Sequence, residues 1–272
     1  MRQCTTCGTG VTFPVETAAE LTGHYPPEYG AFGPTTGLIT GPISRVIVAH
    51  QTRGALVRAP LAAIAGLTPG RVLDVGCGRG DLAAAFIARG WHATGVDPSE
   101  SACRMAAAQG VESLRGTLAT VELDSASFDA AYLHHSLEHS PDIGGDLRAI
   151  ARALRPGAIV AVTAPNFDSW QRRHYGDRWY HLDLPRHRVH FTRAGLTAAL
   201  EDAGFTVSAT STSTSSVGLP ATVQYRLFGH CLFPAGLPLR VATGLCVLTL
   251  PVARLLDRDG GDQLNAVACA LK

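Results

Sequence analysis

The stretch Val72-Leu-Asp-Val-Gly-Cys-Gly-Arg-Gly-Asp81 decides the fold of this 272-residue chain. Its first residues are apolar and β-branched, which favours a buried strand, and glycines follow at alternate positions. The alanine-rich run Asp81–Arg89 is typical of a helix that Gly90 ends. Glycines let the backbone turn sharply beside a ligand, and the start of a helix offers unpaired N–H groups and the positive end of its dipole. The pattern therefore predicts a site for an anionic or nucleoside ligand at the carboxyl edge of a sheet.

Strand-like and helical segments alternate along the rest of the chain. This alternation predicts right-handed βαβ units and a Rossmann-like, doubly wound α/β fold with a mostly parallel sheet. A helix over Arg193–Ala203 and two closing strands would complete a sheet of seven strands. The strands that the pattern places are Arg71–Val75, His92–Val96, Phe128–Leu133, Ala158–Ala164, Phe205 to about Thr210 and Leu264–Leu271.

Three segments fall outside this alternation. Residues 1–60 carry a single Cys-x-x-Cys pair and are predicted to form an amino-terminal cap, with one helix near Ile43–Arg53; residues 61–272 would form the main domain. Within that domain, residues 166–191 are rich in aromatic, histidine and arginine side chains and follow a predicted strand, so we expect a lid over the mouth of the site. Residues 216–260 are markedly apolar and form a second insertion.

Composition narrows the classes of function. Hydrophobic residues make up 46% of the chain, enough for one full-sized core, and 23 Lys and Arg balance 22 Asp and Glu. A net charge of +1 gives no long-range attraction to nucleic acid, although a local arginine-rich stretch at 172–188 would suit either a small acidic substrate or a solvated loop. The number of cysteines is odd, at seven, and only the first two are closely spaced, so we expect no disulfide framework. With an amino terminus that lacks an apolar run, this leads us to expect a cytoplasmic location.

Several motifs occur together in an order that resembles one family. Val72–Gly80 followed by Gly95-Val-Asp97 resembles motif I and its acidic partner in class I S-adenosylmethionine-dependent methyltransferases. The run Ser127–His139 resembles the fourth strand and following loop of the ubiquinone-biosynthesis-type branch, within the methyltransferase domain 23/11-like group. Leu154-Arg-Pro-Gly157 resembles the turn before the fifth strand of that branch. The resemblance covers residues 70–210 or so.

The resemblance implies S-adenosyl-L-methionine as the cofactor and S-adenosyl-L-homocysteine as its product. Asp74 would organise the turn or reach the methionine ammonium, and Asp97 would accept hydrogen bonds from both ribose hydroxyls. The family often contacts the adenine amine through a Gly-Asp pair, whereas this chain has Gly116-Thr-Leu118, so Thr117 or the backbone of Leu118 would substitute. The positions expected at the cofactor are Asp74, Gly76, Cys77, Gly78, Gly80, Asp97, Pro98, Thr117, Leu118 and His134, with Cys77 as a small filler of the turn.

Methyl transfer is an in-line displacement, so the protein mainly supplies alignment, a dry pocket and a base for the proton of the acceptor. His181 and His187 are the preferred base candidates, with Asp183 orienting one of them. His139 is a further candidate, although the Glu138-His139 pair is usually structural in the family. A hydrogen-bond network that merely closes the lid is the alternative for all of these residues. No catalytic metal is expected, because His181 and His187 lack a helical spacing and no carboxylate pair accompanies them.

The acceptor is expected to be a small and hydrophobic organic molecule, such as a prenylated, quinone, polyketide or lipid-linked compound. The apolar 216–260 insertion would cover its pocket or touch a membrane surface. Aromatic π faces in the lid would also suit a cationic or electron-rich acceptor, so both oxygen and carbon methylation stay open. The residues expected at the acceptor are Tyr25, Tyr29, Trp170, Tyr175, Trp179, Tyr180 and Arg186.

The Cys4-Thr-Thr-Cys7 pair resembles one half of a zinc ribbon. Structural zinc normally needs four ligands, and the chain contains no second Cys-x-x-Cys. Two other functions follow as alternatives: a modifier of RNA or protein that uses this pair for recognition, and a protein that binds the cofactor without methyl transfer.

Overall fold

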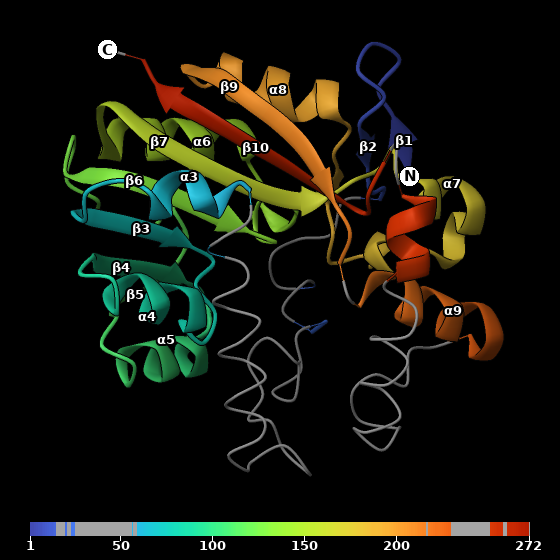
Figure 1. The fold of residues 1–272 in the computed structure, drawn as a ribbon, viewed down its shortest axis with the longest axis horizontal. Coiled ribbons are helices and arrows are strands. Elements are labelled where there is room, and N and C mark those ends of the chain that lie inside the picture. Colours follow the sequence, from blue (N-terminus) through green and yellow to red (C-terminus); the bar gives the residue numbers. More distant parts are fainter. Residues whose placement is uncertain are drawn as a thin grey trace.

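A seven-stranded sheet with strand order β5-β4-β3-β6-β7-β10-β9 forms the centre of the computed structural model (Figure 1). The structure describes residues 1–14, 20, 23–24, 56, 59–215, 217–229, 251–257 and 260–271. The strands of the sheet are β3 (Arg71–Val75), β4 (His92–Asp97), β5 (Glu112–Arg115), β6 (Phe128–His134), β7 (Leu154–Pro165), β9 (Phe205–Ser213) and β10 (Gln263–Ala270). Strands β3 to β7 pair in parallel, and β10 runs antiparallel between β7 and β9. The predicted doubly wound, mostly parallel sheet is confirmed.

Helices cover both faces of this sheet (Figure 1). The helices that pack against it are α3 (Leu61–Ala65), α4 (Asp81–Ile87), α5 (Glu100–Ala107), α6 (Ile143–Ala153) and α8 (Arg193–Asp202). One buried cluster joins Leu147 of α6 and Leu196 of α8 to the sheet, and a second joins Phe86 of α4 to it. Neighbouring residues of β3 divide between the two clusters, because alternate side chains of a strand point to opposite faces.

The boundaries of five strands differ from those predicted, and of these β4 and β6 simply end one residue later, at Asp97 and His134. Strand β7 begins at Leu154 rather than Ala158, because an irregular pairing with β6 lets the turn at Gly157 remain part of the strand. Strand β9 continues to Ser213, and β10 begins one residue earlier than predicted, where it pairs with the end of β9. The longer β9 and the earlier start of β10 bring these strands to the edge of the sheet beside the lid, residues 166–191.

The insertion at 166–191 folds into α7 (Trp170–Tyr175) and two short 3-10 helices, η2 (Gly176–Arg178) and η3 (Tyr180–Leu182). It ends in β8 (Val189–His190), which pairs with an amino-terminal hairpin of β1 (Arg2–Gln3) and β2 (Gly10–Val11). The described start of the predicted cap is thus joined to the lid. Helix α9 (Gly218–Phe228) and a helical turn at 251–256 lie beside α7 (Figure 1).

Two expectations concern residues outside the described part of the chain: the helix near residues 43–53 and most of the apolar 216–260 insertion. In the part that is described, no helix combines the length and the apolar character that crossing a membrane requires.

Candidate active site

The glycine turn lies where the ends of β4 and β6 meet β3. Gly76, Gly78 and Gly80 have φ angles of 76°, 52° and 80°, which side chains rarely tolerate. The N–H groups of Gly76 and Cys77 donate to the Val96 carbonyl at 2.8 and 3.2 Å. A Cβ at Gly76 would lie 2.5 Å from the Cβ of Ser136, in the loop after β6. The Ser136 side chain and the positive φ therefore leave glycine as the residue that fits at position 76.

Asp97 fixes this turn from the end of β4. Its Oδ2 accepts a hydrogen bond from Gly78 N at 3.0 Å, and its Oδ1 accepts one from Ser99 N at 2.8 Å. Burial raises the pKa of the carboxyl, and the two N–H donors oppose that shift. Each carboxylate oxygen accepts more than one hydrogen bond, so the group keeps capacity for a pair of ribose hydroxyls.

Asp74 lies within the sheet beneath the turn. Its Oδ2 accepts a hydrogen bond from the Tyr132 hydroxyl at 2.7 Å, and burial raises its pKa to about 7, against the opposing effect of that bond. The contact of Asp74 in this structure is with Tyr132 of β6, so its role in organising the turn stays a prediction.

Replacing Asp74 with Asn is expected to flatten the pH dependence of stability. Because the folded pKa of about 7 lies above the ordinary carboxyl value of 3.8, this carboxyl stabilises the fold fully at low pH, and that contribution is lost as the pH rises through 7. In urea unfolding at pH 5 and pH 7.5, Asp74→Asn should therefore lose less stability than wild type between the two pH values, while keeping an acceptor for Tyr132. The exposed Asp124→Asn is the control; equal pH slopes for wild type and Asp74→Asn would refute the assignment.

The remaining expected cofactor positions lie around the same edge. Pro98 and Thr117 are exposed after β4 and β5, whereas Leu118 is buried in the core. Cys77 packs against Gly95, where a Cβ would lie 2.7 Å from its sulfur, and burial raises the pKa of its thiol, so it is an inert filler. His134 has a buried Nδ1 without a hydrogen-bond partner, and burial lowers its pKa to about 3.

These residues fit a nucleoside cofactor. The turn offers close backbone approach, and Asp97 offers acceptor capacity for a ribose. The orphaned His134 Nδ1 is a buried polar atom that a ligand could satisfy, as buried polar atoms in proteins are normally paired.

His135 follows β6 and was not singled out by the sequence. Its φ of 55° is unusual for a residue with a side chain and marks a strained position beside the turn. The next residue, Ser136, donates to the Val75 carbonyl at 2.6 Å and so ties this loop to β3.

A chain of side-chain hydrogen bonds runs across the sheet edge to His135. Thr163 donates to Asn265 Oδ1 at 3.0 Å, and Asn265 Nδ2 reaches Ser213 Oγ at 3.0 Å. Ser213 Oγ in turn donates to Gln263 Oε1 at 3.0 Å, and Gln263 Nε2 lies 2.8 Å from His135 Nε2. The amide nitrogen of Gln263 can only donate a hydrogen bond, so His135 Nε2 accepts it.

The other ring nitrogen of His135 then donates to Glu138, with 3.3 Å between Nδ1 and Oε1. Glu138 is fully buried, and burial alone would raise its pKa. The bond from His135 and the charges of the surrounding imidazoles outweigh burial and lower the pKa to about 2. Glu138 is therefore a buried carboxylate, of which Oε2 has no hydrogen-bond partner.

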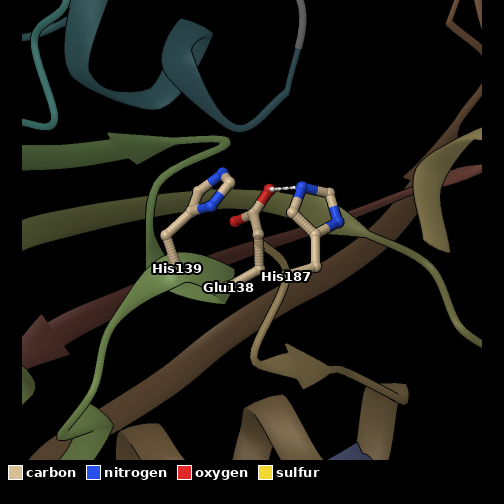
Figure 2. Close-up of side chains that lie close together, drawn as sticks. All are labelled: Glu138, His139 and His187. Carbon is tan, nitrogen blue, oxygen red and sulfur yellow. Dashed lines mark ion pairs between the residues drawn. The ribbon is translucent and has the colours of Figure 1, made fainter. Parts of the chain in front are cut away.

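Glu138, His139 and His187 converge, as Figure 2 shows. Each offers one ligand atom, and the three atoms lie within 4.8 Å of one another. A Glu-His-His set has the chemistry of a zinc site, so this group could hold a metal ion by its geometry. We expected no metal because the sequence shows no carboxylate pair beside His181 and His187. In the structure, Glu138 and His139 come from another segment of the chain and lie beside His187.

His187 is a buried, neutral imidazole. Its Nδ1 lies 2.8 Å from the carbonyl oxygen of His181, so it donates there, and burial lowers the pKa of the ring to about 3. Its Nε2 lies 3.6 Å from Asp183 Oδ2 and 4.0 Å from Glu138 Oε1. Asp183 forms its hydrogen bonds with Arg186 instead, and Arg186 also donates to the His24 carbonyl. The contact expected between Asp183 and a base is thus long, and the carboxylate is engaged locally.

His181 lies at the meeting point of the lid and the sheet. Its Nε2 lies 3.2 Å from Asp262 Oδ2, at the start of β10. Its ring stacks on that of His135, with 6.0 Å between centroids and 7° between planes. His139 places Nδ1 3.1 Å from the Arg186 carbonyl and contacts the ring of His187 edge-on.

The lid aromatics occupy different environments. Trp179 is 2% exposed and packs against Phe167 and Leu182, so it belongs to the core of the lid. Trp170 stacks on His174 at 5.0 Å. Tyr180 contacts the ring of His181 edge-on at 5.0 Å.

Tyr175 lines a cavity of about 530 Å³ together with His174, Arg178 and Arg226. Tyr25 and Tyr29, also expected at the acceptor, lie outside the described residues.

The Cys4–Cys7 pair forms a tight loop on the amino-terminal hairpin. Gly8 N donates to the Cys4 carbonyl at 3.0 Å, and Thr192 Oγ1 donates to the Cys7 carbonyl, which joins the loop to the end of the lid. Across the described residues, neither cysteine belongs to a group of three or more metal-ligating side chains.

The fold and this edge define a class of protein: a Rossmann-like α/β protein that holds a nucleoside cofactor at the carboxyl ends of parallel strands. The chain belongs to the methyltransferase-domain family, whose model matches residues 48–210. The predicted family and cofactor are confirmed.

Curated relatives match the centre of the chain. The ubiquinone biosynthesis O-methyltransferase of Hahella chejuensis is 39% identical over 103 residues, 35% of this chain and 43% of that protein. The enzyme of the same name from Idiomarina loihiensis is 38% identical over 116 residues, 39% of this chain and 47% of that protein. The match therefore spans less than half the length of these relatives.

Solved structures share the fold at low identity. The [4+2]-cyclase SpnF is 20% identical with a TM-score of 0.60, covering 96% of this chain and 98% of its own. Geranyl diphosphate C-methyltransferase from Streptomyces coelicolor A3(2) is 15% identical with a TM-score of 0.56, covering 89% of this chain and 88% of its own. At these identities the likeness concerns the fold alone.

Proposed function

We propose that this protein transfers the methyl group of S-adenosyl-L-methionine to a hydroxyl of a small, hydrophobic organic acceptor, with a lid histidine as the base. One observation carries the proposal: the lid lies directly on the loop that closes the cofactor turn. Arg188 N donates to the Glu138 carbonyl at 2.8 Å, and the imidazoles of His181 and His135 stack. An acceptor under the lid would therefore lie beside the cofactor.

The bound cofactor supplies a methyl group that is already activated for displacement. The protein contributes alignment and a dry site. Asp97 and the glycine turn hold the nucleoside, while the lid excludes water and presents His181. His187 and His139 donate to backbone carbonyls of the lid, so we assign them to closing the lid rather than to the base.

The acceptor class rests on two considerations. The matched relatives are named ubiquinone biosynthesis O-methyltransferases, and the sequence of the 216–260 insertion is apolar. A positioned imidazole suits removal of a hydroxyl proton, which favours oxygen over carbon as the acceptor atom.

The test is incubation of the purified protein with cell extract and S-adenosyl-L-methionine labelled in the methyl group. We expect label in a small molecule soluble in organic solvent, attached to oxygen in its mass spectrum, and no transfer by Asp97→Ala. Label recovered in RNA or protein would favour the recognition role of Cys4 and Cys7. Cofactor binding without any labelled product would identify a protein that binds the cofactor without methyl transfer. Label in RNA or protein and the absence of any labelled product would each refute the proposal.

A further inference from the structure

Two consecutive residues, the one before β10 and the first of that strand, each bind one imidazole of the site. Asp262 lies 3.2 Å from His181 Nε2, and Gln263 lies 2.8 Å from His135 Nε2. The two rings stack nearly parallel, so β10 sets the position of both. Neither residue belongs to a motif in the sequence.

The carboxylate of Asp262 is fully buried and firmly held. Its Oδ1 accepts a hydrogen bond from Ser215 N at 2.7 Å, and its Oδ2 accepts one from Ser215 Oγ at 2.6 Å. A Cβ at Gly218 would overlap Oδ2, so the first residue of α9 leaves just enough room for this oxygen. Ser215 Oγ also accepts from Gly218 N at 2.8 Å, which ties the carboxylate to the start of α9.

An ionised carboxylate only accepts hydrogen bonds. His181 Nε2 must therefore carry the proton in its bond to Asp262, and the lone pair of the neutral ring lies on Nδ1. The hydroxyl of Ser215 is 3.5 Å from the same Nε2 and already donates to Asp262, so it does not compete.

The neighbouring imidazoles lack this arrangement. Both ring nitrogens of His135 are engaged, one with Gln263 and the other with Glu138. His187 uses Nδ1 on a carbonyl, and its Nε2 faces two carboxylates. His181 thus combines a buried carboxylate on one nitrogen with a lone pair on the other.

We propose that Asp262 is the positioning residue for His181: it fixes the Nε2–H tautomer, so that Nδ1 takes the proton of the hydroxyl acceptor. The inference rests on the proposed function. As the acceptor oxygen bonds to the methyl carbon and the sulfur–carbon bond breaks, the hydroxyl proton passes to His181 Nδ1. The positive charge moves from sulfur to the imidazolium, which the carboxylate of Asp262 stabilises.

The tautomer is measurable without any acceptor. In protein labelled with 15N-histidine, nitrogen shifts and couplings to the ring protons identify the protonated nitrogen, and His181→Gln assigns the signal. We expect Nε2–H in wild type. In Asp262→Asn, the amide oxygen of the new side chain should accept the hydrogen bond from Ser215 N. The NH2 group of the same amide then faces His181 Nε2 and can only donate to it. The ring of His181 should therefore change to the Nδ1–H tautomer. Asp257→Asn, at a nearby buried carboxyl without a bond to His181, should leave the tautomer unchanged.

An Nδ1–H tautomer in wild type overturns the inference, and this result needs no variant to fold. So does an unchanged tautomer in folded Asp262→Asn. With the labelled product from cell extract as the probe, Asp262→Asn should lower kcat about 100-fold or more while the KM for the cofactor changes less than about threefold. An unchanged kcat overturns the positioning role. Absence of a product with wild type overturns the proposed function itself, and the tautomer result then still decides what Asp262 does to the ring.

Discussion

Asp97→Ala is expected to weaken binding of S-adenosyl-L-homocysteine about 100-fold. The carboxylate is the group placed to accept two ribose hydroxyls, and each charge-assisted hydrogen bond contributes about 1.5 kcal/mol or more. Losing two such bonds costs about 3 kcal/mol, which corresponds to about two orders of magnitude in affinity. The variant also frees the N–H groups of Gly78 and Ser99, so the turn itself loses its anchor.

Isothermal titration calorimetry measures this effect directly. Glu122→Ala removes an exposed carboxylate from the loop after β5 and should bind like wild type. Asp97→Asn keeps one acceptor oxygen and should fall between the two. Affinity of Asp97→Ala within threefold of wild type would mean that Asp97 does not hold the cofactor.

Gly76→Ala is expected to cost about 2–4 kcal/mol of stability and to remove measurable cofactor binding. Alanine at a φ of 76° is strained by about 1–2 kcal/mol, and its Cβ would lie 2.5 Å from the Cβ of Ser136. Relieving that clash must displace the loop after β6, including the bond from Ser136 to Val75. Both walls of the cofactor site move as a result.

A second glycine with a positive φ angle serves as a control that separates the backbone strain of Gly76→Ala from its clash with Ser136. Gly204 has a φ of 92°, and a Cβ there would meet nothing within 4 Å. Gly204→Ala should therefore show the strain alone in urea unfolding and keep wild-type affinity for S-adenosyl-L-homocysteine. If Gly76→Ala matched Gly204→Ala in both measurements, the close approach of the turn to Ser136 would not matter.

The sheet and the cofactor edge were predictable because their signals are local. The strand, glycine turn and helix over residues 71–87 follow one another in sequence, and hydrophobic periodicity marks each element. Asp97 could be placed because it ends the next strand of the same unit. The alternation of segments then predicted the mostly parallel sheet, but neither the antiparallel place of β10 between β7 and β9 nor strand ends such as the irregular start of β7.

The surroundings of the proposed base could be predicted only in part. His181 stood out in a histidine-rich run, and Asp183 was its natural local partner, yet that carboxylate bonds to Arg186, three residues away. The partner of His181 is Asp262, 81 residues distant, and only the antiparallel insertion of β10 brings it there. No spacing rule reveals a contact that depends on sheet register.

Composition does not show which aromatic side chains of the lid are buried. Trp179 lies in the core of the lid, which its aromatic character alone does not reveal, and its contact with an acceptor stays a prediction. His135 was overlooked because its role depends on a chain of bonds from Thr163 through Gln263, which only the folded sheet assembles.

We infer that the glycine turn and the loop beneath the lid together form the cofactor site. Hydrogen–deuterium exchange with and without S-adenosyl-L-homocysteine tests it most directly, because it locates binding without knowledge of the acceptor. We expect slower exchange at the amides of residues 76–80, 97, 99 and 134–137. Binding that leaves these amides unchanged and protects other residues instead would contradict it.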